Sequence, residues 1–370
     1  MRDLVSAVLI NGQHNSVQGP RARALFGDDV SVVYKERGRF GSIAPTWSAL
    51  RASTSSVAPW VYCIDLGFPS ALLAGVRRRL DRKMRLVYEI GDPMKPLLEP
   101  QARNRFEVEF AHQVDRLLPS EADALVFRGT YLIDHFREIT ARKLPRVMWL
   151  PDGADTAHFR PMRDDPRIAE LRRTHGLEGK FVVGIVGNIH HNPRLDLYYG
   201  WELAEALSHI ARERPEAPIV GVVVGDGAGK PVLEEACRKW GVLDRVKLVG
   251  RVPHEQVPLW MNVFDLGLST QTDDPVGWGR TTAKLPEYLA CGLPLLCSDV
   301  GEAHRLLRET GQTLPYSGKR DASYPARLAT KILEFSTRDL DGIRRHNRDL
   351  ALAQFDYGVL RQRLRTFLEQ

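Results

Sequence analysis

The stretch TTAKLPEYLACGLPLLCSDVGE, residues 281–302, joins a helical pattern to a short apolar run. Apolar residues recur at helical spacing from Leu285, and Gly292 followed by Pro294 is typical of the end of a helix. The run LLCS (295–298) has the composition of a strand that is buried on both faces. The stretch therefore predicts a helix that leads directly into a central strand, as in parallel α/β sheets.

Lys284 and Glu287 stand at the entrance of this predicted helix. A carboxylate in the first turn stabilises the helix dipole by roughly 0.3–1 kcal/mol, which would explain Glu287 without any function. Alternatively, Glu287 accepts hydrogen bonds from a sugar diol, as acidic residues do for nucleotide ribose. Lys284, one turn earlier on the same face and beside Arg280, would then reach a phosphate. Taken alone, the pair supports both interpretations equally.

Apolar runs alternate with longer helical patterns along the chain, which predicts parallel sheets covered by helices. A first series of expected strands comprises residues 6–11, 30–34, 60–66, 85–90 and 116–119. A second series begins afresh and comprises residues 181–187, 219–227, 246–250, 266–270 and 293–298. This α/β pattern, repeated after a polar stretch, predicts two similar domains.

The length of 370 residues also favours two domains over one core. Residues 150–167 are polar and rich in Pro and Asp, as a linker is. We place the boundary near residue 163, so that 1–163 form the first domain and 164–354 the second. Residues 355–370 have the pattern of an amphipathic helix.

The four cysteines are scattered and form no CxxC pair, which suits a reducing cytosol and argues against a disulfide framework or a zinc site. No apolar run approaches the roughly 20 residues that span a bilayer. The run LVSAVLI (4–10) is interpreted as a first strand and not as a signal peptide. We therefore expect a cytoplasmic protein.

All of the net charge of +6 falls in residues 1–163, because the remainder carries equal numbers of basic and acidic side chains. The densest basic run is RRRLDRKMR, residues 77–85. It fits a solvated helix face, and it equally fits a surface that meets anionic lipid at the inner face of a membrane, or an acidic acceptor. No aromatic residues interleave with the basic ones, which argues against nucleic acid as a partner.

The stretch VVVGDGAGKPVLEEA (222–236) has a glycine-rich turn but fails two known phosphate motifs. Val224 and Pro231 occupy positions where a Walker A loop needs Gly and Ser or Thr. Lys230 stands where the dinucleotide fingerprint needs its third Gly. A strand that runs into the turn at Gly225 and Asp226 remains, and such a turn lets backbone N–H groups approach a ligand closely.

A second strand-to-loop transition is VGIVGNIHHNPRLDL, residues 183–197. Gly187 permits a tight exit, and Arg194 lies where a cation could reach a phosphate. His190 and His191 have no carboxylate or thiolate partner at matching spacing, so we interpret them as loop residues and not as metal ligands.

Several segments occur together in a specific order: LPDGADTAHFRP (150–161), VGIVGN (183–188), VVVGDG with LEEA (222–236), DRVKLVGRVPHEQVPLWM (244–261) and KLPEYLACGLPLLCSDVGE (284–302). This series strongly resembles the C-terminal half of family-4 retaining glycosyltransferases with the GT-B fold. The resemblance covers residues 148–310, and the first half of the chain resembles the family only in its strand rhythm. It implies two Rossmann-like domains with parallel sheets that face each other across a cleft. In this fold the C-terminal helix, here 355–370, crosses back onto the first domain.

The resemblance also implies roles for single residues. Glu287 matches the second glutamate of the family's E-x7-E motif, which binds ribose, and Arg194 matches the basic residue at the diphosphate. Arg251 and Val252 match the loop whose backbone contacts the base. Gly12 matches the loop of the first domain that approaches the phosphates.

The sequence departs from the family pattern at three positions. Gly279 replaces the first glutamate of E-x7-E, and Asn188 replaces the second basic residue of the diphosphate site. Gly91, with Asp92 beside it, stands where the family often has a histidine near the transferred sugar.

We hypothesise that Arg280 and Lys284 restore the missing positive charge, and that Asp273 or Asp274 holds the donor sugar. The QTDD turn (271–274) also fits an ordinary polar surface turn. The residues expected to act in catalysis are Arg194, Lys284 and Asp92. Those expected to hold the donor are Gly12, Gly187, Asn188, Arg194, Gly225, Asp226, Arg251, Val252, Gly279, Arg280, Lys284 and Glu287.

The implied activity is transfer of a hexose-type sugar from a nucleoside-diphosphate sugar to a glycan, lipid-linked or metabolite acceptor, with retention of anomeric configuration. The family resemblance places such a reaction in polysaccharide biosynthesis or related pathways, with the donor as co-substrate, no cofactor and no metal. Two alternatives stay open: a sugar-nucleotide epimerase of the same architecture, and a catalytically silent sugar-nucleotide-binding protein.

Overall fold

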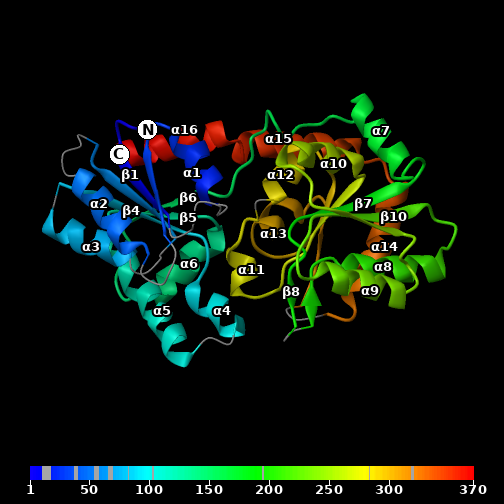
Figure 1. Cartoon of the computed structure of the whole chain (residues 1–370), viewed down its shortest axis with the longest axis horizontal. Helices are drawn as coiled ribbons and strands as arrows, with labels where there is room; N and C mark the ends of the chain where they lie inside the picture. The colour runs from blue at the N-terminus through cyan, green and yellow to red at the C-terminus, as the bar shows by residue number, and fades with distance from the viewer. Residues whose placement is uncertain are drawn as a thin grey trace. The chain divides into compact units, whose positions relative to one another are not determined.

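The computed structural model forms two compact units (Figure 1). Unit 1 consists of Met1–Gly153, Asp274–Thr281 and Phe355–Gln370, and unit 2 consists of Ala154–Asp273 and Thr282–Gln354. The structure describes residues 1–10, 18–36, 41–53, 58–65, 70–81, 83–101, 104–193, 196–282, 284–317 and 321–370. Within these ranges, no helix has both the length and the apolar character needed to cross a bilayer.

Unit 1 is built on a parallel sheet of six strands in the order β2-β1-β3-β4-β5-β6. Its strands are β1 (Val5–Ile10), β2 (Ser31–Tyr34), β3 (Trp60–Ile64), β4 (Arg85–Ile90), β5 (Ala124–Phe127) and β6 (Arg146–Trp149). Its helices are α1 (Gln18–Phe26), α2 (Ile43–Ser53), α3 (Ser70–Leu80), α4 (Met94–Leu98), α5 (Arg105–Leu117), α6 (Thr130–Ile139), α11 (Pro275–Gly279) and α16 (Tyr357–Glu369).

Helices cover both faces of this sheet. Alternate side chains of each strand point to opposite faces, so each strand packs against helices on both sides. On one face, Tyr62 of β3 packs with apolar residues of α1 and α16, which lie side by side (Figure 1). On the other face, Cys63 of the same strand packs with residues of α2, α3 and α6. The central strand β3 is therefore apolar and buried along its whole length, as strands covered on both faces are.

Unit 2 has a second parallel sheet of six strands, in the order β11-β10-β7-β12-β13-β14. Its strands are β7 (Phe181–Val186), β10 (Ile219–Val224), β11 (Val246–Gly250), β12 (Leu266–Ser269), β13 (Leu295–Ser298) and β14 (Thr313–Leu314), beside a hairpin of β8 (His191–Asn192) and β9 (Leu197–Tyr198). Its helices are α7 (Pro166–Thr174), α8 (Trp201–Glu213), α9 (Lys230–Lys239), α10 (Val257–Val263), α12 (Lys284–Ala290), α13 (Gly301–Leu307), α14 (Tyr324–Thr337) and α15 (Asp341–Gln354). The strand order reverses between β7 and β12, which is where doubly wound sheets bind ligands.

The helix-to-strand unit expected in residues 281–302 is confirmed as α12 and β13. Every residue of β13 is buried, and Gly292 has the left-handed φ of +65° that its place after the helix requires.

One expected strand is wrong. Residues 116–119 do not form a strand: they end α5 and begin a 3-10 turn, Leu118–Glu121, in which Pro119 occupies an early position. The segment belongs to an amphipathic helix whose apolar stripe continues into the turn. The strands that follow it, β5 and β6, were not anticipated.

The first boundary between the units lies between Gly153 and Ala154, and not at residue 163. The intervening segment is tied to α10 of unit 2. The amide of Met162 donates to Asn262 Oδ1 at 2.6 Å, and Asn262 Nδ2 donates to the carbonyl of Arg160 at 2.9 Å. These hydrogen bonds attach residues 160–162 to unit 2, so the boundary lies before them. The linker-like composition of the segment gives no sign of these contacts.

Candidate functional site

Three glycines of unit 2 meet at the carboxyl ends of neighbouring strands. Gly187 follows β7, Gly225 follows β10, and Gly250 ends β11. The Gly187 amide donates to the carbonyl of Val224 at 3.0 Å, and the Gly225 amide donates to the carbonyl of Gly250 at 2.9 Å. A Cβ atom on Gly225 would lie 1.8 Å from the carbonyl oxygen of Gly187. The loops therefore approach one another as closely as backbone allows.

Asn188 and Asp226 belong to the same interlocked loops. The amide of Ile189 donates to the carbonyl of Asp226 at 3.0 Å, and a Cβ on Gly227 would lie 2.4 Å from Asn188 Oδ1. Both Asn188 and Asp226 are exposed. Such a surface offers backbone groups and short polar side chains to an anionic or hydroxylated ligand.

Lys230 is a cation of this region to which the sequence analysis assigned no role. It begins α9, and its Nζ lies 3.6 Å from where a Cβ on Gly250 would be. Arg251 and Val252 come directly after Gly250, and Arg251 is exposed. The only sequence signal for Lys230 was its place after a glycine-rich turn, where it counted against the dinucleotide fingerprint.

The entrance of α12 lies at the same end of the sheet. The hydroxyl of Tyr288 accepts a hydrogen bond from the amide of Val186, the last residue of β7, at 2.8 Å. Lys284 Nζ donates to Glu287 Oε2 at 2.6 Å, and Glu287 is 9% exposed. The structure thus brings Lys284 and Glu287 to the strand end that carries Gly187, with Tyr288 as the residue that fixes the helix there.

Two of the expected site residues, Gly12 and Arg194, lie outside the residues that the structure describes. Their roles stay predictions. Three others, Asp92, Gly279 and Arg280, belong to unit 1.

Arg280 lies outside α12, which begins at Lys284. It follows the last residue of α11 in an extended conformation, and its Nε donates to Asp92 Oδ1 at 2.5 Å. Its Nη2 donates to Asp92 Oδ2 at 3.2 Å. The guanidinium and the Asp92 carboxylate therefore form a two-point ion pair inside unit 1, and the charge of Arg280 is already balanced.

Gly279 is a glycine for reasons of packing. A Cβ atom there would lie 2.8 Å from Leu132 Cδ2, and a Cβ on Gly129 would lie 2.1 Å from the Gly279 carbonyl oxygen. The backbone of α11 thus rests directly on the start of α6, and a side chain at 279 would have to displace Leu132. Asp274 begins this segment and caps α11, because its Oδ1 accepts from the amides of Val276 and Gly277.

A buried ionic cluster lies under the carboxyl edge of the unit 1 sheet. Glu89 Oε1 accepts from Arg21 Nε at 2.9 Å and from Arg128 Nε at 2.8 Å, and the hydroxyl of Tyr62 donates to Glu89 Oε2 at 2.6 Å. Burial opposes ionisation of Glu89, but the charges of Arg21 and Arg128 outweigh it and lower the pKa of Glu89 to about 2. The carboxylate is therefore ionised and fixes both arginines.

The basic run of α3 is largely neutralised by carboxylates of unit 1. Arg78 Nη2 lies 2.5 Å from Asp123 Oδ1, and Arg79 Nη2 lies 2.5 Å from Glu121 Oε1. Arg77 likewise pairs with Asp81, four residues later, at 3.0 Å. These pairs favour the interpretation of residues 77–81 as a solvated helix face.

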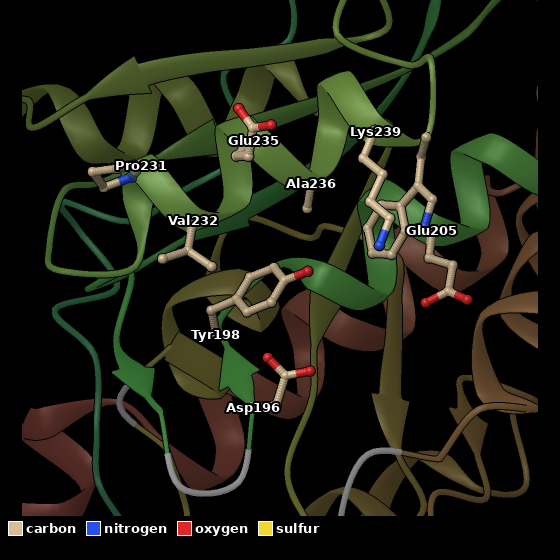
Figure 2. Close-up of a pocket in the computed structure, with 9 residues that line it drawn as sticks. Asp196, Tyr198, Glu205, Pro231, Val232, Glu235, Ala236 and Lys239 are labelled. Atoms are coloured by element: carbon tan, nitrogen blue, oxygen red, sulfur yellow. The ribbon is translucent and has the colours of Figure 1, made fainter.

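Unit 2 also contains a cavity of about 540 Å³, which is not lined by Gly187, Gly225 or Gly250 (Figure 2). None of the expected site residues lines it. Its walls come from β9, α8 and α9 and consist of Asp196, Tyr198, Glu205, Pro231, Val232, Glu235, Ala236, Lys239 and Trp240. In the described part of the chain, no three His, Cys, Asp or Glu side chains gather as metal ligands would.

Glu202, at the start of α8, is a buried carboxylate whose Oε2 has no hydrogen-bond partner among the described residues. Burial raises its pKa from 4.5 to about 7, although hydrogen bonds from Thr270 and Tyr316 oppose the shift. The folded protein therefore holds a proton that the unfolded chain loses above pH 4.5. We expect this group to cost about 3 kcal/mol of stability, a cost that develops between pH 4.5 and 7 and is constant above pH 7.

Glu202→Gln removes this ionisation, so the variant should gain thermal stability over wild type as pH rises from 5 to 8. Thermal unfolding across that range measures the difference. Glu213→Gln, at the exposed end of the same helix, is the control and should follow wild type. A constant difference between Glu202→Gln and wild type at all pH values would contradict a neutral Glu202.

Comparison with known proteins bears on the loops just described. Residues 180–337 match the family of glycosyl transferases group 1. They form a group 1 glycosyl transferase domain. This domain contains the three glycine loops, Lys230 and the Lys284–Glu287 pair, so the residues that the structure brings together in unit 2 all lie inside it.

Curated relatives match about half of the chain. Alpha-D-kanosaminyltransferase of Streptomyces kanamyceticus is 25% identical over 180 residues, which is 48% of this chain and 42% of that protein. The 2-deoxystreptamine glucosyltransferase of the same organism is 29% identical over 194 residues, or 50% of this chain and 47% of that protein. The chain thus spans about half the length of the curated relatives it matches.

Among solved structures, HepE of Anabaena in complex with UDP has a TM-score of 0.72 and 15% identity, with 99% of each chain covered. At this identity the likeness concerns the fold alone, and it confirms the GT-B fold.

Proposed function

We propose that this protein transfers a hexose-type sugar from a nucleoside-diphosphate sugar to an acceptor hydroxyl, with retention of anomeric configuration. The observation that carries the proposal is the cradle formed by the loops at Gly187, Gly225 and Gly250 beside the Lys284–Glu287 pair. A glycosyl transferase domain with close-packed backbone loops, a fixed cation and a carboxylate has the chemistry to hold a diphosphate and a ribose.

The names of similar proteins support this proposal. The curated relatives are glycosyltransferases, and HepE has been solved with UDP, with UDP and glucose, and with UDP-glucose. In our proposal Glu287 accepts hydrogen bonds from the ribose diol, and Lys284 and Lys230 face the diphosphate.

The reaction breaks the bond between the anomeric carbon and the diphosphate oxygen and forms a bond to the acceptor oxygen. Negative charge develops on the departing phosphate, so fixed cations and backbone donors there lower the barrier. In the proposed mechanism the departing phosphate takes the acceptor's proton on the same face of the sugar. Lys284, together with Arg194, would supply the positive charge in place of a metal ion.

A panel of UDP-, GDP-, ADP-, dTDP- and CMP-sugars, with NAD as control, tests the proposal on the full chain. Ligand at 100 times Kd stabilises a protein by about 2.7 kcal/mol, a rise in Tm of a few degrees for units of this size. We expect one nucleotide to respond and its sugar to be transferred equally well with and without EDTA. No response to any nucleotide would overturn the proposal.

Two other outcomes of the panel point to other functions. Conversion of the donor's sugar without any acceptor would indicate an epimerase. Binding without turnover would indicate a catalytically silent sugar-nucleotide-binding protein. Gly91 and Gly279 favour this alternative, because both positions lack the side chain that the family resemblance leads us to expect.

A further inference from the structure

We propose that Asp65 and Arg128 hold hydroxyl groups of a sugar acceptor that carries no phosphate or carboxylate. The inference rests on the proposed sugar transfer and deepens it, because it assigns the acceptor's binding residues within unit 1. It begins at Gly91, the position at which the family resemblance leads us to expect a histidine.

Asp65, Gly91 and Arg128 occupy equivalent places on three neighbouring strands. They follow directly on the last residues of β3, β4 and β5, which are adjacent in the sheet. The three residues therefore lie side by side at its carboxyl edge. The strand order of unit 1 reverses between β1 and β3, so Asp65 stands at the switch point where ligands of doubly wound sheets bind.

Arg128 occupies the space that a side chain at position 91 would need. A Cβ atom on Gly91 would lie 2.8 Å from Nη1 and 2.9 Å from Cζ of Arg128. The guanidinium thus packs directly on the glycine backbone. The loss of a side chain at 91 and the presence of Arg128 are parts of one arrangement.

The Arg128 guanidinium is held in a fixed orientation. Its Nε donates to Glu89 Oε1 at 2.8 Å, and its Nη2 donates to Asp65 Oδ1 at 3.1 Å. Glu89 is itself fixed by Arg21 and Tyr62. Nη1 makes no hydrogen bond to any residue that the structure describes, so it is oriented and available to a ligand oxygen.

Asp65 lies further toward solvent than Arg128. Its side chain is 28% exposed and that of Arg128 is 12% exposed. Its φ of +63° is left-handed, a conformation that is uncommon outside glycine but that Asp adopts more readily than most residues. Its second oxygen accepts from Gln18 Nε2 at 2.9 Å. A fixed carboxylate that accepts and a fixed guanidinium that donates can together hold a hydroxylated ring.

The charge of the cluster selects against an anionic acceptor. Arg21 and Arg128 face the carboxylates of Glu89, Asp65 and Asp152, so carboxylates outnumber guanidinium groups. Glu89 and the two arginines are the most buried members, whereas the Asp65 and Asp152 carboxylates are more exposed. A phosphate or carboxylate on the acceptor would meet these carboxylates first, whereas a neutral or amine-bearing sugar would not be repelled.

Thermal shift of the full-length protein with methyl glucoside, glucosamine and glucose 6-phosphate, at millimolar concentrations, tests the inference. Methyl glucoside or glucosamine should raise Tm, and glucose 6-phosphate should not. Asp65→Asn and Arg128→Lys should each lower the affinity for the sugar about tenfold, which is the effect of losing one hydrogen bond that involves a charged group. The shift in Tm at a given sugar concentration should shrink accordingly. Asp81→Asn and Arg77→Lys are matched controls, because they alter another Asp–Arg pair of unit 1 with Asp81 25% exposed.

Three results would overturn the inference: no response of wild type to any of these sugars, a response to glucose 6-phosphate alone, or a wild-type response in Asp65→Asn. Asp65→Asn also decides the matter if Arg128→Lys does not fold, since asparagine keeps the shape of the side chain. Donor binding is measured on the same samples. A missing donor response in wild type counts against the proposed function, whereas an intact donor response with an unaltered sugar response in Asp65→Asn counts against this inference only.

Discussion

Glu287→Ala should abolish most of the thermal stabilisation that the responding nucleotide sugar gives to wild type. In the proposed site the ionised carboxylate accepts hydrogen bonds from both ribose hydroxyls, and hydrogen bonds to a charged group contribute about 1.5–3 kcal/mol each. The substitution also leaves the ammonium of Lys284 without its partner at 2.6 Å. We expect donor affinity to fall at least about a hundredfold. Titration calorimetry with the donor measures the change directly.

A matched control exists in the same unit. Lys331 and Glu334 form an ion pair with the same three-residue spacing, at 2.7 Å, on α14. Glu334→Ala removes a carboxylate of the same kind at an exposed position, so it should leave donor affinity unchanged. Full donor affinity in Glu287→Ala would show that Glu287 only stabilises the first turn of α12.

Gly225→Ala should disrupt the donor cradle more completely than any other single methyl group added to these loops. The new Cβ would lie 1.8 Å from the carbonyl oxygen of Gly187, and φ of +149° at Gly225 is a conformation that alanine rarely adopts. The strained backbone alone costs about 1–3 kcal/mol, and the clash forces the two loops apart. We expect donor binding to be lost and Tm to fall by several degrees.

Gly241→Ala separates the two causes. Gly241 also has a left-handed φ, +67°, but nothing lies within 4 Å of a Cβ built there. Its replacement should cost only about 1–2 kcal/mol and leave donor affinity intact. If Gly225→Ala binds the donor as Gly241→Ala does, contact between the Gly187 and Gly225 loops is not needed for the site.

The parts of the fold that could be predicted were those whose signal is local. The strands expected at 181–187 and 219–227 are β7 and β10, because continuous apolar runs between glycines mark buried parallel strands. The placement of Lys284 and Glu287 on one face of α12 followed from helical spacing, but the ion pair between them was not predicted. The end of α5 was mistaken for a strand because so short an apolar run, Leu117 to Pro119, fits a helix and a strand equally well.

The parts that could not be predicted depend on residues far apart in the chain. Arg280 and Asp92 are 188 positions apart, and only the packing of α11 in unit 1 makes them partners. The same packing explains Gly279, which the sequence shows only as a departure from a motif. The carboxylates that neutralise Arg78 and Arg79 likewise come from another part of unit 1, so the charge of that run could not be judged from composition.

The sequence by itself determined the α/β class, the two series of strands except β5, β6 and β14, the glycine exits and the residues at the entrance of α12. Each of these depends on periodicity or spacing within about a dozen residues, which the backbone geometry of helices and strands imposes. Only the tertiary structure decided that Arg128 lies against Gly91, that Arg280 is paired and that Tyr288 ties α12 to β7. Contacts of this kind arise when a sheet brings its strand ends together, and no local pattern records which side chains then meet.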